Sequence, residues 1–122
     1  MTESRIIKGL LTVAEEALDV EFKAMNVPGR EGVEIHSLYS TKETGPDGPA
    51  AALVRYLPGA EVKRHVHPGY ELILVLEGEM TNDSGTHGPG TLEVLSPNST
   101  HSLSSEKGCT FLVVWEQPVR PA

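Results

Sequence analysis

Three side chains of the types that bind metal ions lie within seven residues of one another. His65 and His67 are two positions apart, which places both imidazoles on the same face of a β-strand. Pro68-Gly69 then turns the chain, and Glu71 begins an apolar run from which its carboxylate can return towards the histidines. Two neutral imidazoles and a carboxylate suit a borderline divalent cation such as iron, manganese, zinc, nickel or copper. The spacing therefore predicts a divalent metal site.

A fourth candidate ligand lies about 30 residues further along the chain. His101 follows a turn at Pro97-Asn98-Ser99, and a third imidazole from this position would close one side of the ion. One or two coordination positions would then remain for water or for a substrate. We therefore expect His65, His67, Glu71 and His101 to hold the ion, while the sequence assigns no catalytic residue and no organic cofactor.

The first three candidates belong to a longer pattern, Gly-x5-His-x-His-x3-Glu-x6-Gly. Five fixed letters at these spacings arise by chance with a probability on the order of 2×10⁻⁴, given the composition of the chain. The pattern is the first signature of the cupin superfamily, and its five positions are matched by Gly59, His65, His67, Glu71 and Gly78. The chain therefore resembles a cupin.

The second cupin signature, Gly-x5-Pro-x-Gly-x2-His-x3-Asn, is matched irregularly. Pro97 stands four residues before His101 instead of five, Ser99 stands where the glycine is sought, and Ser105 replaces the closing asparagine. By this irregular match, the resemblance implies that His101 is the fourth metal ligand.

The stretch from Ala52 to Val114 is similar to one subgroup, the ChrR-type cupin domains. The similarity rests on the run from His65 to Gly78, on Gly-Pro-Gly-Thr, and on Pro-Asn-Ser-Thr-His-Ser. Such domains occur at the C-terminus of zinc-containing anti-sigma factors and as stand-alone proteins. The resemblance implies an all-β double-stranded β-helix, the cupin jelly-roll barrel, in a single domain of residues 1–122 with its core at about 33–116.

The spacing of glycine and proline along the chain agrees with an all-β sandwich or barrel. Apolar and alternating runs predict strands at 20–24, 33–36, 50–57, 60–66, 70–76, 91–96, 100–105 and 109–116. We expect a turn at Pro58-Gly59 and a turn-rich loop at 41–49. The segment Leu11–Leu18 contains good helix formers and fits one short N-terminal helix.

Strand parity predicts what surrounds the ion. Ile73 and Val75 share a face with Glu71, and Leu103 shares a face with His101. The ion would therefore lie in a mostly apolar cup, which is typical of sites for small molecules.

Parity also raises two questions about neighbouring positions. Either Arg55 or Tyr56 points into the cup, and the pattern leaves the choice open. Leu72, Leu74 and Leu76 lie on the opposite face of a strand that is apolar on both sides. This second face needs a cover, which predicts a homodimer.

Composition excludes several partners. The net charge is −7 and the sequence has no cluster of lysine and arginine, so we expect no nucleic-acid binding. The longest apolar runs are five residues, far short of the roughly 20 that cross a membrane, and residues 1–8 lack the apolar stretch of a secretory leader. We therefore expect a cytoplasmic protein. Cys109 is the single cysteine and is expected to be a buried thiol.

Two classes of function fit these expectations. The first is a metal-dependent oxygenase, an Fe(II) dioxygenase acting on a small organic substrate such as an enolisable dicarbonyl, because the similar stand-alone proteins include β-diketone-cleaving members. The second is a non-catalytic, metal-dependent ligand-sensing cupin related to the cupin domain of ChrR-type anti-sigma factors. An anti-sigma role itself is not expected, since the roughly 50 residues before the core hold one histidine and no cysteine. An isomerase or epimerase is a third interpretation, which does not require this ligand set.

Overall fold

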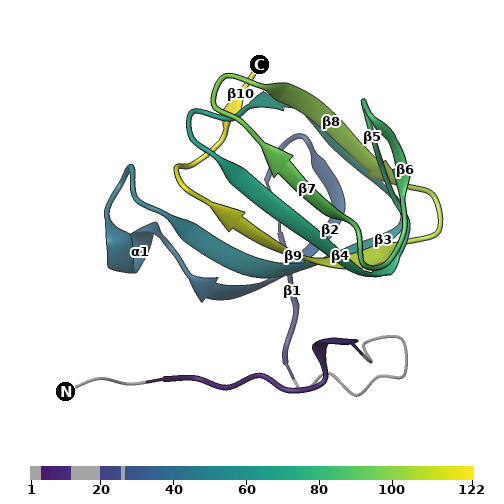
Figure 1. Ribbon diagram of the computed structural model, residues 1–122, viewed down its shortest axis with the longest axis horizontal. Coiled ribbons are helices and arrows are strands. Elements are labelled where there is room, and N and C mark those ends of the chain that lie inside the picture. The colour runs from purple at the N-terminus through teal and green to yellow at the C-terminus, as the bar shows by residue number, and fades with distance from the viewer. Residues whose placement is uncertain (1–3, 12–19, 26) are drawn as a thin grey trace.

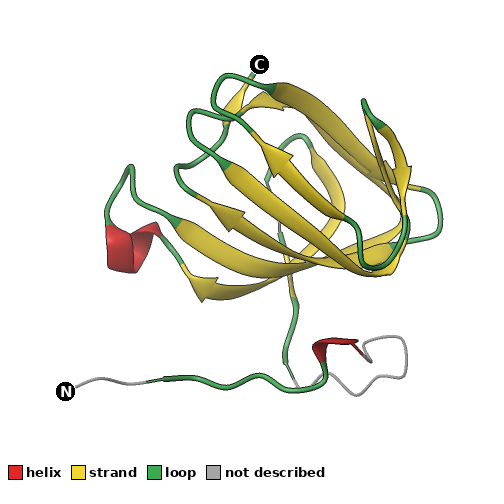
Figure 2. Cartoon of the chain, viewed as in Figure 1, coloured by secondary structure: helices red, strands yellow, loops and turns green. Residues whose placement is uncertain are grey.

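The computed structural model describes residues 4–11, 20–25 and 27–122. The strands form an antiparallel β-barrel that carries one short α-helix, while residues 4–11 lie outside the barrel and end in a 3₁₀ turn at residues 10–11 (Figures 1 and 2). The elements are β1 (Lys23–Ala24), β2 (Arg30–Tyr39), α1 (Thr41–Thr44), β3 (Ala50–Val66), β4 (Glu71–Gly78), β5 (Met80–Asn82), β6 (Gly85–His87), β7 (Leu92–Leu95), β8 (Thr100–Ser105), β9 (Cys109–Trp115) and β10 (Arg120–Pro121). The hydrogen-bonded order β6-β5-β8-β3-β9-β4-β7 curls into the barrel, while β2 and β10 lie off this path beside β3. The predicted double-stranded β-helix is confirmed.

β3 is the longest strand, and it joins the two halves of the barrel. Residues 50–56 pair with β9, whereas residues 60–66 pair with β8. The predicted turn at Pro58-Gly59 is wrong, because the chain continues through it as one strand. Gly59 adopts φ +86° there, a conformation that glycine adopts without strain. The Pro-Gly pair therefore bends the strand at the point where it changes partner.

The interior of the barrel is apolar, as strand parity predicts. The core includes Val54, Tyr56, Ile73, Val75, Leu103, Phe111 and Val113. Of the two alternatives on β3, Tyr56 is the one that points inward, and its ring packs edge-on against Phe111. Arg55 points outward, where its guanidinium lies 3.7 Å from the Glu34 carboxylate and 4.0 Å from the centre of the Phe22 ring.

Helical structure departs from the prediction. Positions 12–18 of the expected helix lie outside the described residues. The loop expected at 41–49 begins with α1, whose start is fixed by a capping box: Lys42 N–H donates to Ser40 Oγ, and Ser40 N–H donates to Glu43 Oε1. No helix among the described residues approaches the length and apolarity needed to cross a membrane.

The outer face of β4 and β7 carries exposed apolar side chains. Leu72 is 41% exposed, Leu92 58% and Val94 61%, and Leu72 is the direct partner of Val94 in the sheet. Leu76, by contrast, is buried within the chain itself. The exposed apolar surface on this face is therefore formed by Leu72, Leu92 and Val94, and Leu76 is not part of it.

Candidate metal centre

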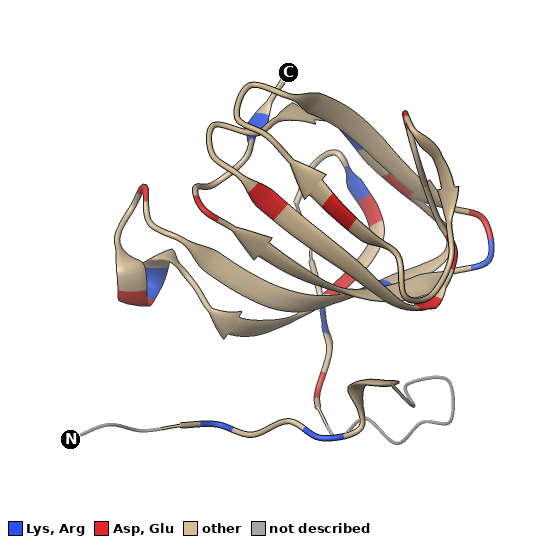
Figure 3. Ribbon diagram, viewed as in Figure 1, with Lys and Arg blue, Asp and Glu red and all other residues tan. Residues whose placement is uncertain are grey.

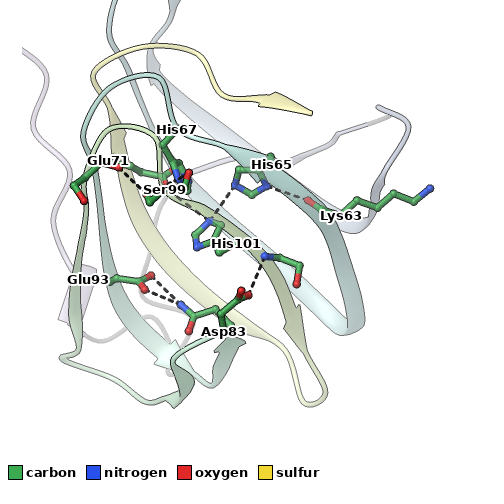
Figure 4. A network of polar contacts seen from close by, with 11 residues as sticks. Lys63, His65, His67, Glu71, Asp83, Glu93, Ser99 and His101 are labelled. Carbon is green, nitrogen blue, oxygen red and sulfur yellow. Dashed lines mark hydrogen bonds and ion pairs between the residues drawn. The ribbon is translucent and has the colours of Figure 1, made fainter. Parts of the chain in front are cut away.

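Three strands and two turns bring the four predicted ligands together at one end of the barrel (Figure 4). β3 ends at Val66 and β4 begins at Glu71, so the turn between them holds His67. β8 pairs with β3 in the register that sets His101 opposite His65. One nitrogen or oxygen atom from each of the four side chains lies within 4.8 Å of all the others. All four residues are at most 6% exposed.

The turn that precedes β8 explains the irregular second motif. Asn98 N–H donates to His67 O at 2.7 Å, and His67 N–H donates to Ser99 O at 2.9 Å, so the two turns hold each other. Asn98 has φ +72°, the left-handed conformation that favours glycine and that asparagine tolerates. Counted back from His101, Asn98 and not Ser99 occupies the glycine position of the signature. Gly90, Asn98 and His101 therefore keep the spacing of the signature, and Pro97 is displaced by one residue.

The three imidazole rings face a common centre. Their planes are nearly perpendicular, at 78–82°, with centroids 4.5–5.0 Å apart. His101 Nε2 lies 3.0 Å from His65 Nε2, and His67 Nε2 lies 2.8 Å from Glu71 Oε2. Two ligands at right angles around an ion, with bonds of about 2.1 Å, would be about 3.0 Å apart. The spacing of the donor atoms therefore fits a divalent cation.

Backbone carbonyls orient two of the rings. His65 Nδ1–H donates to Lys63 O at 3.0 Å, and His67 Nδ1–H donates to Ser99 O at 3.0 Å, with Ser99 Oγ at 3.1 Å. A carbonyl can only accept, so Nδ1 carries the proton and Nε2 keeps its lone pair towards the centre. This outer layer of hydrogen bonds is the arrangement that fixes metal-binding histidines in proteins.

Apart from the ion pair that a protonated His67 would form with Glu71, three buried polar atoms of the cluster have no hydrogen-bond partner among the described residues: His67 Nε2, Glu71 Oε2 and His101 Nδ1. Such atoms are rare and costly inside proteins unless an ion or water satisfies them. A cation at the centre would satisfy His67 Nε2 and Glu71 Oε2 together. Without a cation a shared proton does so, and Glu71 accordingly holds the pKa of His67 above its usual range, although burial lowers it. The four residues therefore fit a divalent metal site.

The other two histidines are held neutral. Burial lowers the pKa of His65. Burial, assisted by the neighbouring His65 and His67, lowers the pKa of His101 to about 3. Both imidazoles are therefore unprotonated near neutral pH, which is the form that binds metals.

An interior cavity of about 20 Å³ adjoins the cluster. Its wall includes His65, Glu71, Tyr56 and Ile73, and it also includes the side chain of Arg30 from the start of β2. This volume holds one water-sized molecule. A substrate larger than that must approach the cluster from outside the barrel.

A polar chain of three residues beside the cluster was not predicted. Asn82 Nδ2 donates to both carboxylate oxygens of Glu93 at 2.9 Å, and His87 Nε2 lies 3.0 Å from Asn82 Oδ1. Glu93 is the partner of the inward-facing Ile73 in the sheet, and burial raises its pKa. The alternation of side chains along β7 could have predicted that Glu93 points inward, because Glu93 lies on the opposite face of the strand from the exposed Leu92.

Comparison with known proteins places the chain among cupins. The family model described as the ChrR Cupin-like domain matches residues 15–119. The anti-sigma-E factor ChrR of Cereibacter sphaeroides is 33% identical over 76 residues, which cover 60% of this chain and 36% of that protein. The chain thus spans about a third of the length of this curated relative.

Two solved structures share the fold. The polyketide cyclase RemF of Streptomyces resistomycificus matches with a TM-score of 0.70 and 27% identity, over 85% of this chain and 80% of the other. An acetylacetone dioxygenase of Acinetobacter johnsonii matches with a TM-score of 0.76 and 16% identity, over 98% and 77%. At 16% identity the second match shows the fold alone.

Proposed function

The chain belongs to the ChrR cupin-like domain family, and from this premise we propose that it is a metal-dependent dioxygenase that cleaves a small β-dicarbonyl compound. One observation carries the proposal: three imidazoles and one carboxylate, all buried, meet at a single centre with the spacing that a divalent cation requires. His65, His67, Glu71 and His101 would hold the ion. Coordination positions that they leave free would be available to a substrate and to O₂.

The choice of substrate class follows from what two relatives have in common. Acetylacetone is a β-diketone, and polyketides carry carbonyl groups on alternate carbons. The names of both structural neighbours therefore point to the same unit, two carbonyl groups separated by one carbon. Such a unit loses a proton from the middle carbon and can offer two oxygens to one cation.

The residues of this chain would bind and shield the reacting group. When bound, the metal would act as a Lewis acid towards the carbonyl oxygens and, as iron(II), would relay electrons to O₂. Lys63 O and Ser99 O fix the rings of His65 and His67, so the donor atoms need no rearrangement. The apolar wall, to which Ile73 belongs, would keep bulk water from the reacting carbon.

Two measurements test this proposal. Mass spectrometry of the protein, purified without a chelating tag, should find about one iron per chain. O₂ consumption with a panel of β-dicarbonyls should then be seen with wild type and with a His36→Ala control, whose imidazole lies on β2 outside the cluster. It should be lost in His101→Ala. No O₂ uptake across the panel by iron-loaded protein would overturn the proposal.

Ligand sensing is the second candidate, because a third of the ChrR anti-sigma factor matches this chain at 33% identity. In that case the cluster would hold a structural or ligand-binding ion, and no turnover would occur. A bound zinc, together with ligand-dependent changes in thermal stability and no O₂ uptake, would favour sensing over catalysis.

We also propose that a second copy of the chain covers the outer face at Leu72, Leu92 and Val94. The exposed apolar area is what suggests this homodimer. Light scattering should give twice the chain mass for wild type and the single chain mass for Val94→Lys. The control Leu57→Lys changes an exposed leucine on β3 and should stay dimeric. A monomeric wild type at micromolar concentration would contradict the proposal.

A further inference from the structure

We propose that the ligand of this site carries a carboxylate, which binds in a basic groove beside His65. The groove is defined by four basic residues in its wall: Arg30, Lys63, Arg64 and Arg120. The inference rests on the proposed function, because the dicarbonyl end of the same molecule would occupy the cluster.

The groove arises from the pairing of β3. β2 reaches one edge of this strand with Arg30 opposite Val62, and Gly29 O accepts from Lys63 N–H at 3.0 Å. β10 reaches the same edge from the other end, with Arg120 opposite Val66. The space between the two strands has a volume of about 440 Å³. The fold therefore leaves room for a small molecule at this edge of the barrel.

The wall of the groove concentrates positive charge on an acidic protein. It holds four of the ten lysine and arginine residues of a chain whose net charge is −7, and within residues 4–11, 20–25 and 27–122 no aspartate or glutamate lines it. Figure 3 shows basic segments close to the C terminus, on β10 and the strands beside it. The sequence has no run of basic residues, but the fold brings together basic residues from segments that are distant in the chain.

Three of these four cations have no carboxylate partner in the part of the chain that the structure describes. Arg64 forms an ion pair with Asp83 at 2.7 Å, in which both side chains are more than 40% exposed. Among the described residues, no carboxylate lies within ion-pair distance of Arg30, Lys63 or Arg120. Unpaired guanidinium groups favour a planar anion, and a carboxylate accepts two parallel hydrogen bonds from one guanidinium. The chemistry of the wall thus favours an oxyanion, and a carboxylate is the oxyanion that a small dicarbonyl compound most simply carries.

The groove also connects to the cluster. His65 lies in its wall, and Arg30 lines both the groove and the interior cavity at His65 and Glu71. In Figure 4 the Lys63 side chain extends away from the histidines, so Lys63 contributes at the outer rim. The groove, at about 440 Å³, is large enough for a small organic ligand and includes a residue of the cluster in its wall. The interior cavity, at about 20 Å³, is too small for such a ligand. A ligand with carbonyls at the cluster would therefore direct a further anionic group past Arg30 into the groove that Arg120 also lines.

A matched pair of ligands tests the inference. Acetopyruvate is acetylacetone with one terminal methyl replaced by a carboxylate, so the two share the β-dicarbonyl unit and differ in charge. Their dissociation constants would be measured by calorimetry on the protein with its native metal, without O₂, so that no turnover intervenes. We expect wild type to bind acetopyruvate about 10- to 100-fold more tightly than acetylacetone.

The variants locate the source of that preference. Arg120→Gln and Arg30→Gln should each reduce the preference to about threefold or less, and Arg30→Lys, which keeps the charge but loses the planar pair of donors, should retain only part of it. Arg55→Gln is the control, since Arg55 lies on β3 outside the groove and pairs with Glu34. Arg120 is exposed, so its replacement leaves the core intact. Metal content would be measured for every variant to exclude an effect through the cluster.

The outcomes separate the groove from the proposed function. Equal affinity for the two ligands, or a preference that survives in both glutamine variants, would overturn the groove, and so would failure of both ligands to bind. A preference that depends on Arg30 and Arg120, combined with no O₂ uptake by the iron-loaded protein, would sustain the groove and reject the dioxygenase. The groove would then recognise the ligand of a sensing domain.

Discussion

The His/Glu cluster and the basic groove share His65, yet they hold their charged groups in opposite ways. In the cluster every side chain is buried, and two rings are fixed by backbone carbonyls. In the groove the cations are partly or fully exposed, and no carboxylate among the described residues pairs with Arg30 or Arg120. The first arrangement is built for one small ion at a fixed distance. The second attracts an anion through charge, with looser demands on its shape.

This contrast predicts the largest effect for a ligand of the cluster. His67→Ala removes a donor atom and leaves Glu71 buried without its partner, so metal affinity should fall by more than about 100-fold. Metal content after dialysis against a chelator measures the loss. Binding of inorganic phosphate to the groove, followed by amide shifts near Arg120, should persist in the same variant.

His36→Ala serves as the control for that experiment, because it removes an imidazole that the structure places outside the cluster. Unchanged metal content in His67→Ala would show that the centre does not bind the ion as proposed. A variant that fails to fold is recognised from its circular dichroism, and His67→Gln then takes its place.

Acid should act on the cluster and spare the groove. Glu71 raises the pKa of His67 above its usual value of about 6.5, so below that pH a proton competes with the metal. His101, with a pKa of about 3, does not take up a proton in this range. Apparent metal affinity should therefore fall about tenfold per pH unit from pH ~6.5 to pH ~5, with release of about one proton per ion bound.

Calorimetry in two buffers of different ionisation enthalpy measures the protons released. Arginine does not titrate in this range, so the preference for acetopyruvate over acetylacetone should stay constant down to pH ~5. If metal affinity does not change across the same pH range, the proton at His67 and Glu71 does not compete with the metal ion, and the predicted competition is wrong.

A smaller effect is expected from the outer layer of the cluster. Ser99 Oγ accepts from His67 Nδ1–H and donates to Ser96 O at 2.6 Å, while the Ser99 carbonyl also holds the ring. Ser99→Ala removes the hydroxyl but keeps the carbonyl, so metal affinity should fall by up to about tenfold. Ser102→Ala, on β8 beside His101, is the matched control and should bind metal as wild type does. An equal loss of metal affinity in both variants would mean that the effect comes from disturbance of this region of the chain and not from the hydrogen bond to the His67 ring.

The cluster was readable from sequence because most of it is local. His65, His67 and Glu71 lie on either side of one turn, and strand geometry fixes how such close neighbours face. His101 joins them through the pairing of β8 with β3, which local spacing does not encode and which the family resemblance supplied. Pro58-Gly59 illustrates the opposite case, in which a local turn signal yields to the pairing of one strand with two partners.

The groove could not be predicted from the sequence, because its basic residues are not local to one another. Arg30, Lys63 and Arg120 are separated by 33 and 57 positions (63 − 30 and 120 − 63), so no window of the sequence contains them together. Their meeting depends on β2 and β10 reaching the same edge of β3. Net charge is an average over the whole chain, so it does not show where basic residues gather once the chain is folded.

The smallest expected effect comes from salt, and it separates the two regions most directly. Raising the ionic strength from about 0.1 M to about 1 M shortens the Debye length from about 10 Å to about 3 Å. The exposed cations of the groove are then screened, so the preference for acetopyruvate should fall about three- to fivefold. Metal affinity should stay nearly constant with a non-coordinating salt, because the donor atoms are at most 6% exposed and lie within 4.8 Å of one another. If salt weakens both interactions equally, the cluster must be open to solvent in solution. If it weakens neither, the preference for the carboxylated ligand arises from contacts other than the arginines of the groove.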